Sequence, residues 1–128
     1  MQGKILQVID QAYRCTAEEQ DDPVLWITAA MRGAGANLHV LLRGNGVCYA
    51  TVGQDAGGVA IGGRPQTQPP RIDRDVAKLI EGGATVFVVE DDAAERGLER
   101  TDLVAGVQPV PRARLAGLYE EFAQVWHW

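Results

Sequence analysis

The chain has 128 residues, of which 46% are hydrophobic, and a formal net charge of -5, so we expect one globular domain spanning residues 1–128. The negative charge argues against a broad basic surface for nucleic acid, and we expect no such partner. No apolar run approaches the roughly 20 residues that cross a bilayer, and the first residues lack a signal-peptide layout. We therefore expect a cytoplasmic protein without a membrane partner.

Strands and helices alternate along the first part of the chain. Residues 4–9 and 37–42 are short apolar runs that predict strands. Residues 24–32 between them have helical periodicity, and Pro23 suits the first position of that helix. The pattern is typical of a strand, a crossover helix and a second, parallel strand.

A glycine-rich segment follows the second strand. Residues 43–46 predict a tight turn, and residues 47–50 predict the start of a short helix. Residues 54–70 are rich in Gly, Pro and Gln and predict a long loop. A loop of this length in a compact domain is usually functional, disordered or buried in an oligomer.

The second half of the chain continues the alternation. Residues 72–81 predict a helix, and residues 85–89 form an unbroken β-branched and aromatic run, typical of a strand buried on both faces. The remaining elements are a short helix over 93–97, a strand over 107–110, a helix over 112–122 and a last strand over 124–128. We therefore predict a single-domain α/β sandwich with a mainly parallel sheet of about five strands flanked by helices.

The expected sheet topology brings chemically active residues together. Segments that leave parallel strands emerge at the same edge of the sheet, where ligands bind in open α/β folds. Cys15 follows the first strand, Cys48 the second, and Asp91 and Asp92 the third. We therefore expect these four residues to form a site, with both cysteines as candidate catalytic groups.

Each candidate also has a simpler interpretation. Cys48 is expected near a helix start, where the helix dipole favours the thiolate, yet a single cysteine is more often a small buried hydrophobe. Cys15 lies in a polar loop, so its thiol is expected to be exposed and either reactive or incidental. Asp91 and Asp92 could be a pair of carboxylates that perturb each other, although a helix cap is the favoured interpretation.

The sequence evidence for other binding residues is weaker. Gly44, Asn45 and Gly46 follow a strand and are weak evidence for a phosphate-binding turn. Two histidines are too few, and too poorly spaced, to indicate a zinc site. We expect neither a metal ion nor a cofactor.

Four short motifs resemble the DsrE/DsrF/DsrH family, which corresponds to the TusD/TusC/TusB sulfur-relay proteins. They are GNGVCYA (44–50), VFVVEDDAAERGL (86–98), LVAGV (103–107) and VWHW (125–128). The likeness is closest to the DsrH/TusB-like branch. It implies a small α/β sandwich that assembles as a homotrimer, as a homohexamer or with related DsrE-family subunits. It also implies that the protein carries sulfur as a cysteine persulfide from a donor protein to an acceptor protein.

The resemblance also shows where this chain departs from the family. DsrE-like members carry the sulfur on a cysteine just after strand three, whereas residues 89–92 here contain none. The DsrH branch uses a cysteine in the segment after strand one, where Cys15 lies. The resemblance therefore favours a cytoplasmic sulfur-relay protein, with a DsrE-like binding or scaffold subunit without catalysis as the alternative. A small-molecule binder that uses the 44–46 turn is the third interpretation.

Overall fold

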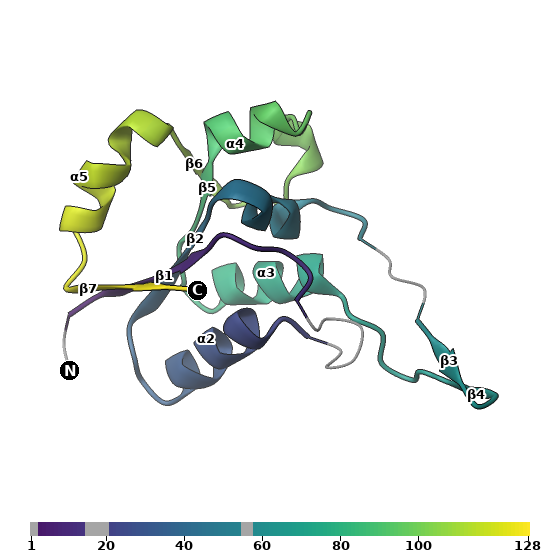
Figure 1. The fold of residues 1–128 in the computed structure, drawn as a ribbon. Coiled ribbons are helices and arrows are strands. Elements are labelled where there is room, and N and C mark those ends of the chain that lie inside the picture. Colours follow the sequence, from purple (N-terminus) through teal and green to yellow (C-terminus); the bar gives the residue numbers. More distant parts are fainter. Residues whose placement is uncertain (1–2, 15–20, 55–57) are drawn as a thin grey trace.

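The structure is a computed structural model that describes residues 3–14, 21–54 and 58–128. Its main sheet has five strands in the order β6-β5-β2-β1-β7 (Figure 1). All four neighbouring pairs are parallel. The strands are β1 (Ile5–Ile9), β2 (Leu38–Leu42), β5 (Val86–Val89), β6 (Gln108–Val110) and β7 (Gln124–His127). The predicted α/β domain with a parallel sheet of about five strands is thus confirmed.

Helices cover the two faces of the sheet unequally. One face packs against α2 (Pro23–Gly33), α3 (Ile72–Glu81) and the 3-10 helix η1 (Gly44–Ala50), around the larger of two apolar clusters. The other face packs against α5 (Leu115–Glu120), around the smaller cluster. Figure 1 shows α2 and α3 together on one side of the sheet and α5 on the other. Shorter helices follow β5 and β6, namely α4 (Glu90–Glu95), η2 (Arg100–Asp102) and η3 (Arg112–Arg114).

Strand β1, which lies between β2 and the edge strand β7, is buried along its whole length. Successive side chains of β1 point to opposite faces of the sheet. Ile9 therefore packs in the larger apolar cluster, and Leu6 and Val8 pack in the smaller one. The one polar residue, Gln7, is fully buried and satisfied at both ends of its amide. It donates to Thr28 Oγ1 at 3.0 Å and accepts from Trp128 Nε1 at 2.6 Å. The side chain of Trp128 is therefore attached to the middle of strand β1.

The ends of the regular elements follow local rules. Asp22 caps α2, because its Oδ1 accepts from the backbone N–H groups of Val24 (2.8 Å) and Leu25 (3.0 Å). Pro23 occupies the first helical position, as predicted. Pro109 lies in β6, which pairs only with β5 and is an edge strand of the main sheet, where a missing N–H donor is tolerated.

Three helix boundaries differ from the prediction. η1 begins at Gly44, where a tight turn was expected, and α4 begins at Glu90, directly after β5, rather than at residue 93. The last helix is divided into η3 and α5. The helix η1 can begin directly after Arg43 because Gly46 lies against the main chain of Ile9. A larger residue at position 46 would not fit there.

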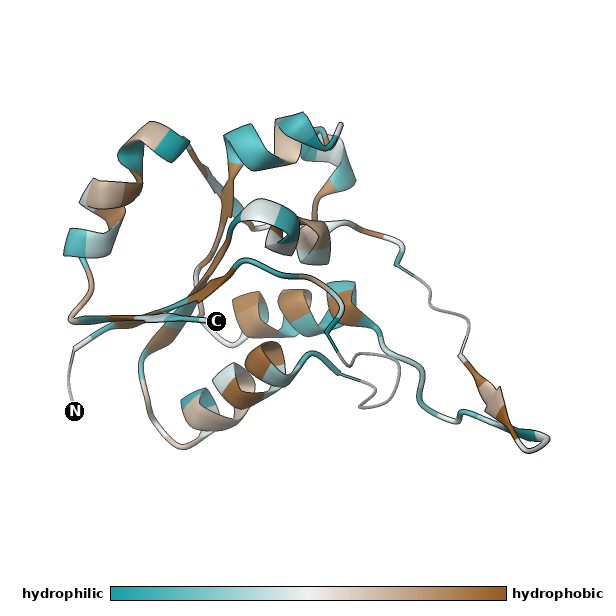
Figure 2. Cartoon of the chain, viewed as in Figure 1, coloured by the Kyte–Doolittle hydropathy of each residue, from teal (hydrophilic) through white to brown (hydrophobic). Residues whose placement is uncertain are grey.

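The predicted loop over 54–70 contains a small antiparallel hairpin, formed by β3 (Ala60–Ile61) and β4 (Arg64–Pro65). It projects away from the body of the domain (Figure 1) and carries apolar residues on its first strand (Figure 2). Ile61 is 79% exposed. Within the described residues no helix is both long and apolar enough to span a membrane.

Candidate functional site at the carboxyl edge of the sheet

All five parallel strands contribute a charged or ionisable side chain at or just beyond their carboxyl ends. Asp10 follows β1, Arg43 follows β2, Asp92 lies on α4 after β5, Arg112 follows β6, and His127 is the last residue of β7. The carboxyl ends of parallel strands meet at one edge, which explains how residues so distant in the chain converge. They form two neighbouring polar networks.

The first network joins β1, β2 and β7. Arg43 binds Asp10 through two hydrogen bonds, Nε to Oδ1 at 2.7 Å and Nη2 to Oδ2 at 2.9 Å, and donates from Nη1 to the Tyr119 hydroxyl at 2.9 Å. The Nε2 atom of His127 faces both Arg43 and Asp10. Arg43 can only donate, so this nitrogen either accepts from Arg43 or donates to Asp10, according to the tautomer.

The charge on Asp10 is favoured by this arrangement. Partial burial acts to raise the pKa of Asp10, but hydrogen bonds from Arg43 and His127 outweigh it, and the pKa is lowered. The same hydrogen bond to Asp10 raises the pKa of Arg43. Asp10 and Arg43 are therefore both ionised at neutral pH, and the network attaches the edge strand β7 to β1 and β2.

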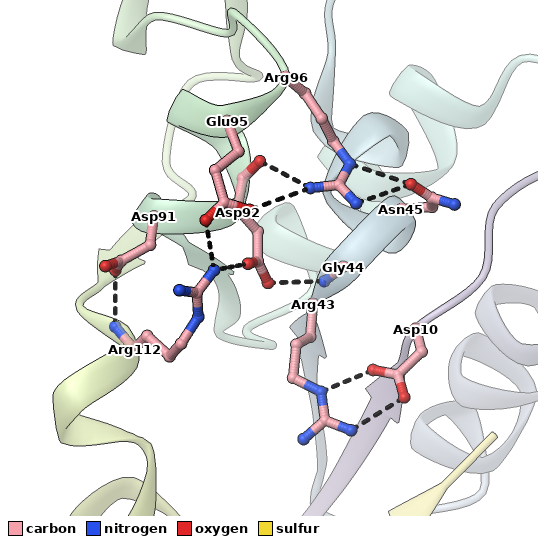
Figure 3. A network of polar contacts seen from close by, with 9 residues as sticks. All are labelled: Asp10, Arg43, Gly44, Asn45, Asp91, Asp92, Glu95, Arg96 and Arg112. Carbon is pink, nitrogen blue, oxygen red and sulfur yellow. Dashed lines mark hydrogen bonds and ion pairs between the residues drawn. The ribbon is translucent and has the colours of Figure 1, made fainter.

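Asp92 is the centre of the second network (Figure 3). Its side chain is buried. Its Oδ2 accepts from the backbone N–H of Gly44 at 2.7 Å, and its Oδ1 forms a salt bridge with Arg112, which also reaches Glu95 at 3.0 Å. Burial acts to raise the pKa of Asp92, but the Gly44 N–H and the guanidinium of Arg112 lower it further than burial raises it.

The acidic residues after β5 do not cap their own helix, contrary to the favoured interpretation. The N-cap residue of α4 is Val89, which makes no side-chain capping bond. Asp91 accepts from the backbone N–H of Arg112 at 2.8 Å, whereas Asp92 binds the first residue of η1. Strand β5 lies between β2 and β6, so its acidic corner reaches the segments that leave both neighbours.

The residues of the 44–46 turn serve the protein itself. Asn45 Oδ1 accepts from Arg96 Nε at 3.0 Å and Nη2 at 2.8 Å. The backbone N–H of Gly46 donates to the carbonyls of Arg43 (2.9 Å) and Asp10 (3.1 Å). With the Gly44 N–H bound to Asp92, two amides of the turn already have acceptors within the domain.

Cys48 lies in the second half of η1. It is a free, partly exposed cysteine, and its carbonyl accepts from the Tyr13 hydroxyl at 3.4 Å and from the backbone N–H of Thr51 at 3.1 Å. The helix start that was expected to favour its thiolate is instead at Gly44, where the carboxylate of Asp92 binds. Cys15 lies outside the described residues.

Several members of the two networks were not predicted as site residues, among them the strand-end residues Asp10, Arg43, Arg112 and His127. A usable signal was present for these four, because each stands at the carboxyl end of a strand or within two residues of it. Among the described residues, no group of three or more His, Cys, Asp or Glu side chains could hold a metal ion. The described side chains at this edge include paired charges and the exposed His127, and Cys48 lies nearby on η1.

No protein-family model matches the sequence, and no curated protein matches it. The structure is similar to that of the ychN protein from E. coli, with a TM-score of 0.70, 17% sequence identity and 100% of both chains covered. The fold is DsrE-like. A protein of unknown function from Methanobacterium thermoautotrophicum is also similar, with a TM-score of 0.62 and 16% identity over 96% of this chain and 97% of the other. At such identities the similarity shows the fold alone.

Proposed function

We propose that this protein is a sulfur-relay protein, which accepts sulfane sulfur from a donor protein as a cysteine persulfide and passes it to an acceptor. The observation that carries the proposal is the position of Cys48, a free and partly exposed thiol that follows β2 at the carboxyl edge of a DsrE-like sheet. Cys15, which follows β1 in the sequence, is the second candidate carrier.

The chemistry needs no external oxidant. The cysteine thiolate attacks the terminal sulfur of a donor persulfide, the sulfur–sulfur bond of the donor breaks, and the donor leaves as a thiolate. The same exchange in reverse passes the sulfur on. A carrier therefore requires an accessible thiol on a fixed support, and η1 provides such a support. Gly44 and Gly46 bind neighbouring segments, and Tyr49 is fully buried, with its hydroxyl bound to Asp22.

A specific observation favours the alternative, a binding subunit without sulfur chemistry. The positive end of η1 donates to the carboxylate of Asp92, and Cys48 lies toward the other end of the helix. Negative charge is stabilised near a helix N-terminus and not near its C-terminus. A thiolate at Cys48 thus lacks that source of activation.

Persulfide loading distinguishes a sulfur carrier from a binding subunit without sulfur chemistry. Wild type, Cys15→Ser, Cys48→Ser and the double variant are incubated with a persulfide donor and analysed by intact-mass spectrometry. We expect an added mass of about 32 Da, one sulfur atom, on the wild type and none on the double variant. Loss in Cys15→Ser alone indicates a DsrH-like carrier, and loss in Cys48→Ser alone places the sulfur on η1. An unmodified wild type contradicts sulfur transfer and leaves the binding subunit.

We also propose that the chain acts in the cytoplasm as a homotrimer or homohexamer, or together with related DsrE-family subunits. Apolar side chains exposed on the edge strand β7 and on the projecting hairpin support this, among them Val125 and Ile61. The neighbouring terminal residue Trp128 is also 46% exposed. Light scattering is expected to give a trimer or hexamer for the chain alone, or a larger species on addition of related subunits. A monomer at micromolar concentration under both conditions contradicts the assembly.

A further inference from the structure

A groove lies between α2 and α3 and is lined by residues of both helices. Leu25, Ala29 and Leu79 form its apolar part, in a cavity of about 340 Å³. Trp26 lines the same part and is 60% exposed. The two helices have ten and eleven residues, so the groove is about 15 Å long. Figure 1 shows the two helices side by side.

A second, polar cavity of about 200 Å³ continues the groove at the start of α3. Arg71 and Arg74 line this polar part. Asp21, Asp75 and Lys78 line both cavities and therefore lie where the two meet. The groove therefore has an apolar part with the indole of Trp26 and a polar part with two arginines. Two carboxylates and a lysine lie where these parts meet.

The cations of this groove differ from those at the carboxyl edge of the sheet. There, Arg43, Arg96 and Arg112 each form a salt bridge with a carboxylate. Arg71, Arg74 and Lys78 make no salt bridge with any residue that the structure describes, although Lys78 lies near enough to Asp75 to affect its titration.

Arg32, at the far end of the groove, donates to two backbone carbonyls, which are neutral groups, those of Leu38 (2.7 Å) and Gly82 (3.0 Å). Four cationic side chains therefore face two carboxylates in the groove, in a chain whose net charge is -5. The local excess of positive charge is complementary to an anion.

We propose that this groove binds a ribonucleoside monophosphate, with the base against Trp26 and the phosphate at Arg71, Arg74 and Lys78. Aromatic side chains stack on bases without sequence preference, and guanidinium and ammonium groups are the usual partners of phosphate. Asp21 and Asp75 lie between these two ends, where carboxylates accept hydrogen bonds from ribose hydroxyls, as an acidic residue does in dinucleotide sites. The cavity volumes suit a small molecule.

Calorimetric titration of the whole 128-residue chain with AMP tests the proposal. We expect Trp26→Ala and Arg74→Ala each to weaken AMP binding about tenfold or more. Arg64→Ala is the matched control, because Arg64 lies on the projecting hairpin, and it should leave the affinity unchanged. Adenosine, inorganic phosphate and 2′,3′-dideoxy-AMP should each bind more weakly than AMP. Thermal unfolding of each variant checks that it is folded.

Several results would overturn the site. One is the absence of any heat of binding at about 10 mM AMP, an affinity too weak for a specific site. Others are equal affinity in wild type, Trp26→Ala and Arg74→Ala, or phosphate binding as tightly as AMP. A smaller particle mass for Trp26→Ala in light scattering would show that a second copy of the chain covers the groove. None of these results depends on sulfur transfer by Cys15 or Cys48.

Discussion

Replacement of Gly46 by alanine is expected to destabilise the folded protein by about 3 kcal/mol or more, because the added methyl group overlaps the main chain of β1. A Cβ atom at this position would lie 2.1 Å from the carbonyl oxygen of Ile9 and 2.9 Å from its carbonyl carbon. The same oxygen accepts from the backbone N–H of Arg43 at 3.0 Å. Since β1 is paired on both sides, it cannot move away without loss of sheet hydrogen bonds.

Gly117→Ala provides the matched control. Gly117 lies within α5, and a Cβ atom there would meet no atom within 4 Å. Alanine should therefore stabilise the protein by about 0.5–1 kcal/mol, as expected for a glycine in a helix interior. Urea unfolding of both variants measures the two effects. A Gly46→Ala variant with an unfolding free energy equal to that of the wild type would contradict the close approach of η1 to β1.

The fold could be predicted from the sequence because its signals are local. The apolar runs at 37–42 and 85–89 became β2 and β5, and the helix expected over 72–81 has the same limits in the structure. Buried parallel strands and crossover helices have distinct hydrophobic patterns that need no knowledge of distant residues. The alternation of the two then specifies a parallel sheet.

The polar networks could not be predicted in this way, because their members are brought together only by the completed sheet. Asp10 and His127 are 117 residues apart, and Arg43 and Tyr119 are 76 apart. Nothing in the local sequence of Asp10 indicates that β7 pairs with β1. The order of strands in the sheet depends on burial and packing over the whole chain. A single sequence therefore indicates which residues lie at the carboxyl edge of the sheet, but not which of them are neighbours there.

The two glycines of the 44–46 turn also have a structural role within the domain. From the sequence, Gly44 and Gly46 are weak evidence for a phosphate-binding turn, and that remains a prediction. In the structure Gly44 has a φ of 55°, a left-handed conformation that glycine adopts without strain, and Gly46 allows contact with Ile9. The left-handed conformation of Gly44 and the close contact of Gly46 with Ile9 both require glycine within the domain itself. A phosphate-binding loop requires glycine for the same two reasons, namely backbone conformation and close approach.

Asp92→Asn is expected to have the second large effect, a loss of about 1–3 kcal/mol of unfolding free energy at pH 7, the usual cost of an unsatisfied buried polar group. Asparagine fills the same space, but it has one acceptor oxygen where the carboxylate has two. Its amide group must face either the Gly44 N–H or the guanidinium of Arg112, and in both cases a donor then faces a donor.

The pH dependence identifies the charge as the cause. The pKa of Asp92 is lowered in the folded protein, so its contribution to stability is present above the unfolded pKa, about 3.9, and is lost as the pH falls through the folded value. The difference in unfolding free energy between wild type and Asp92→Asn should therefore decrease from pH 7 to pH 3.

Asp91→Asn is the control for Asp92→Asn. Asp91 is only partly buried, and its Oδ1 accepts from the backbone N–H of Arg112, a bond that an asparagine oxygen can accept equally well. The variant should unfold at nearly the same urea concentration as the wild type at both pH values. Equal losses in the two variants, or a loss in Asp92→Asn that does not change with pH, would show that the buried carboxylate does not hold η1 and the segment after β6 against α4.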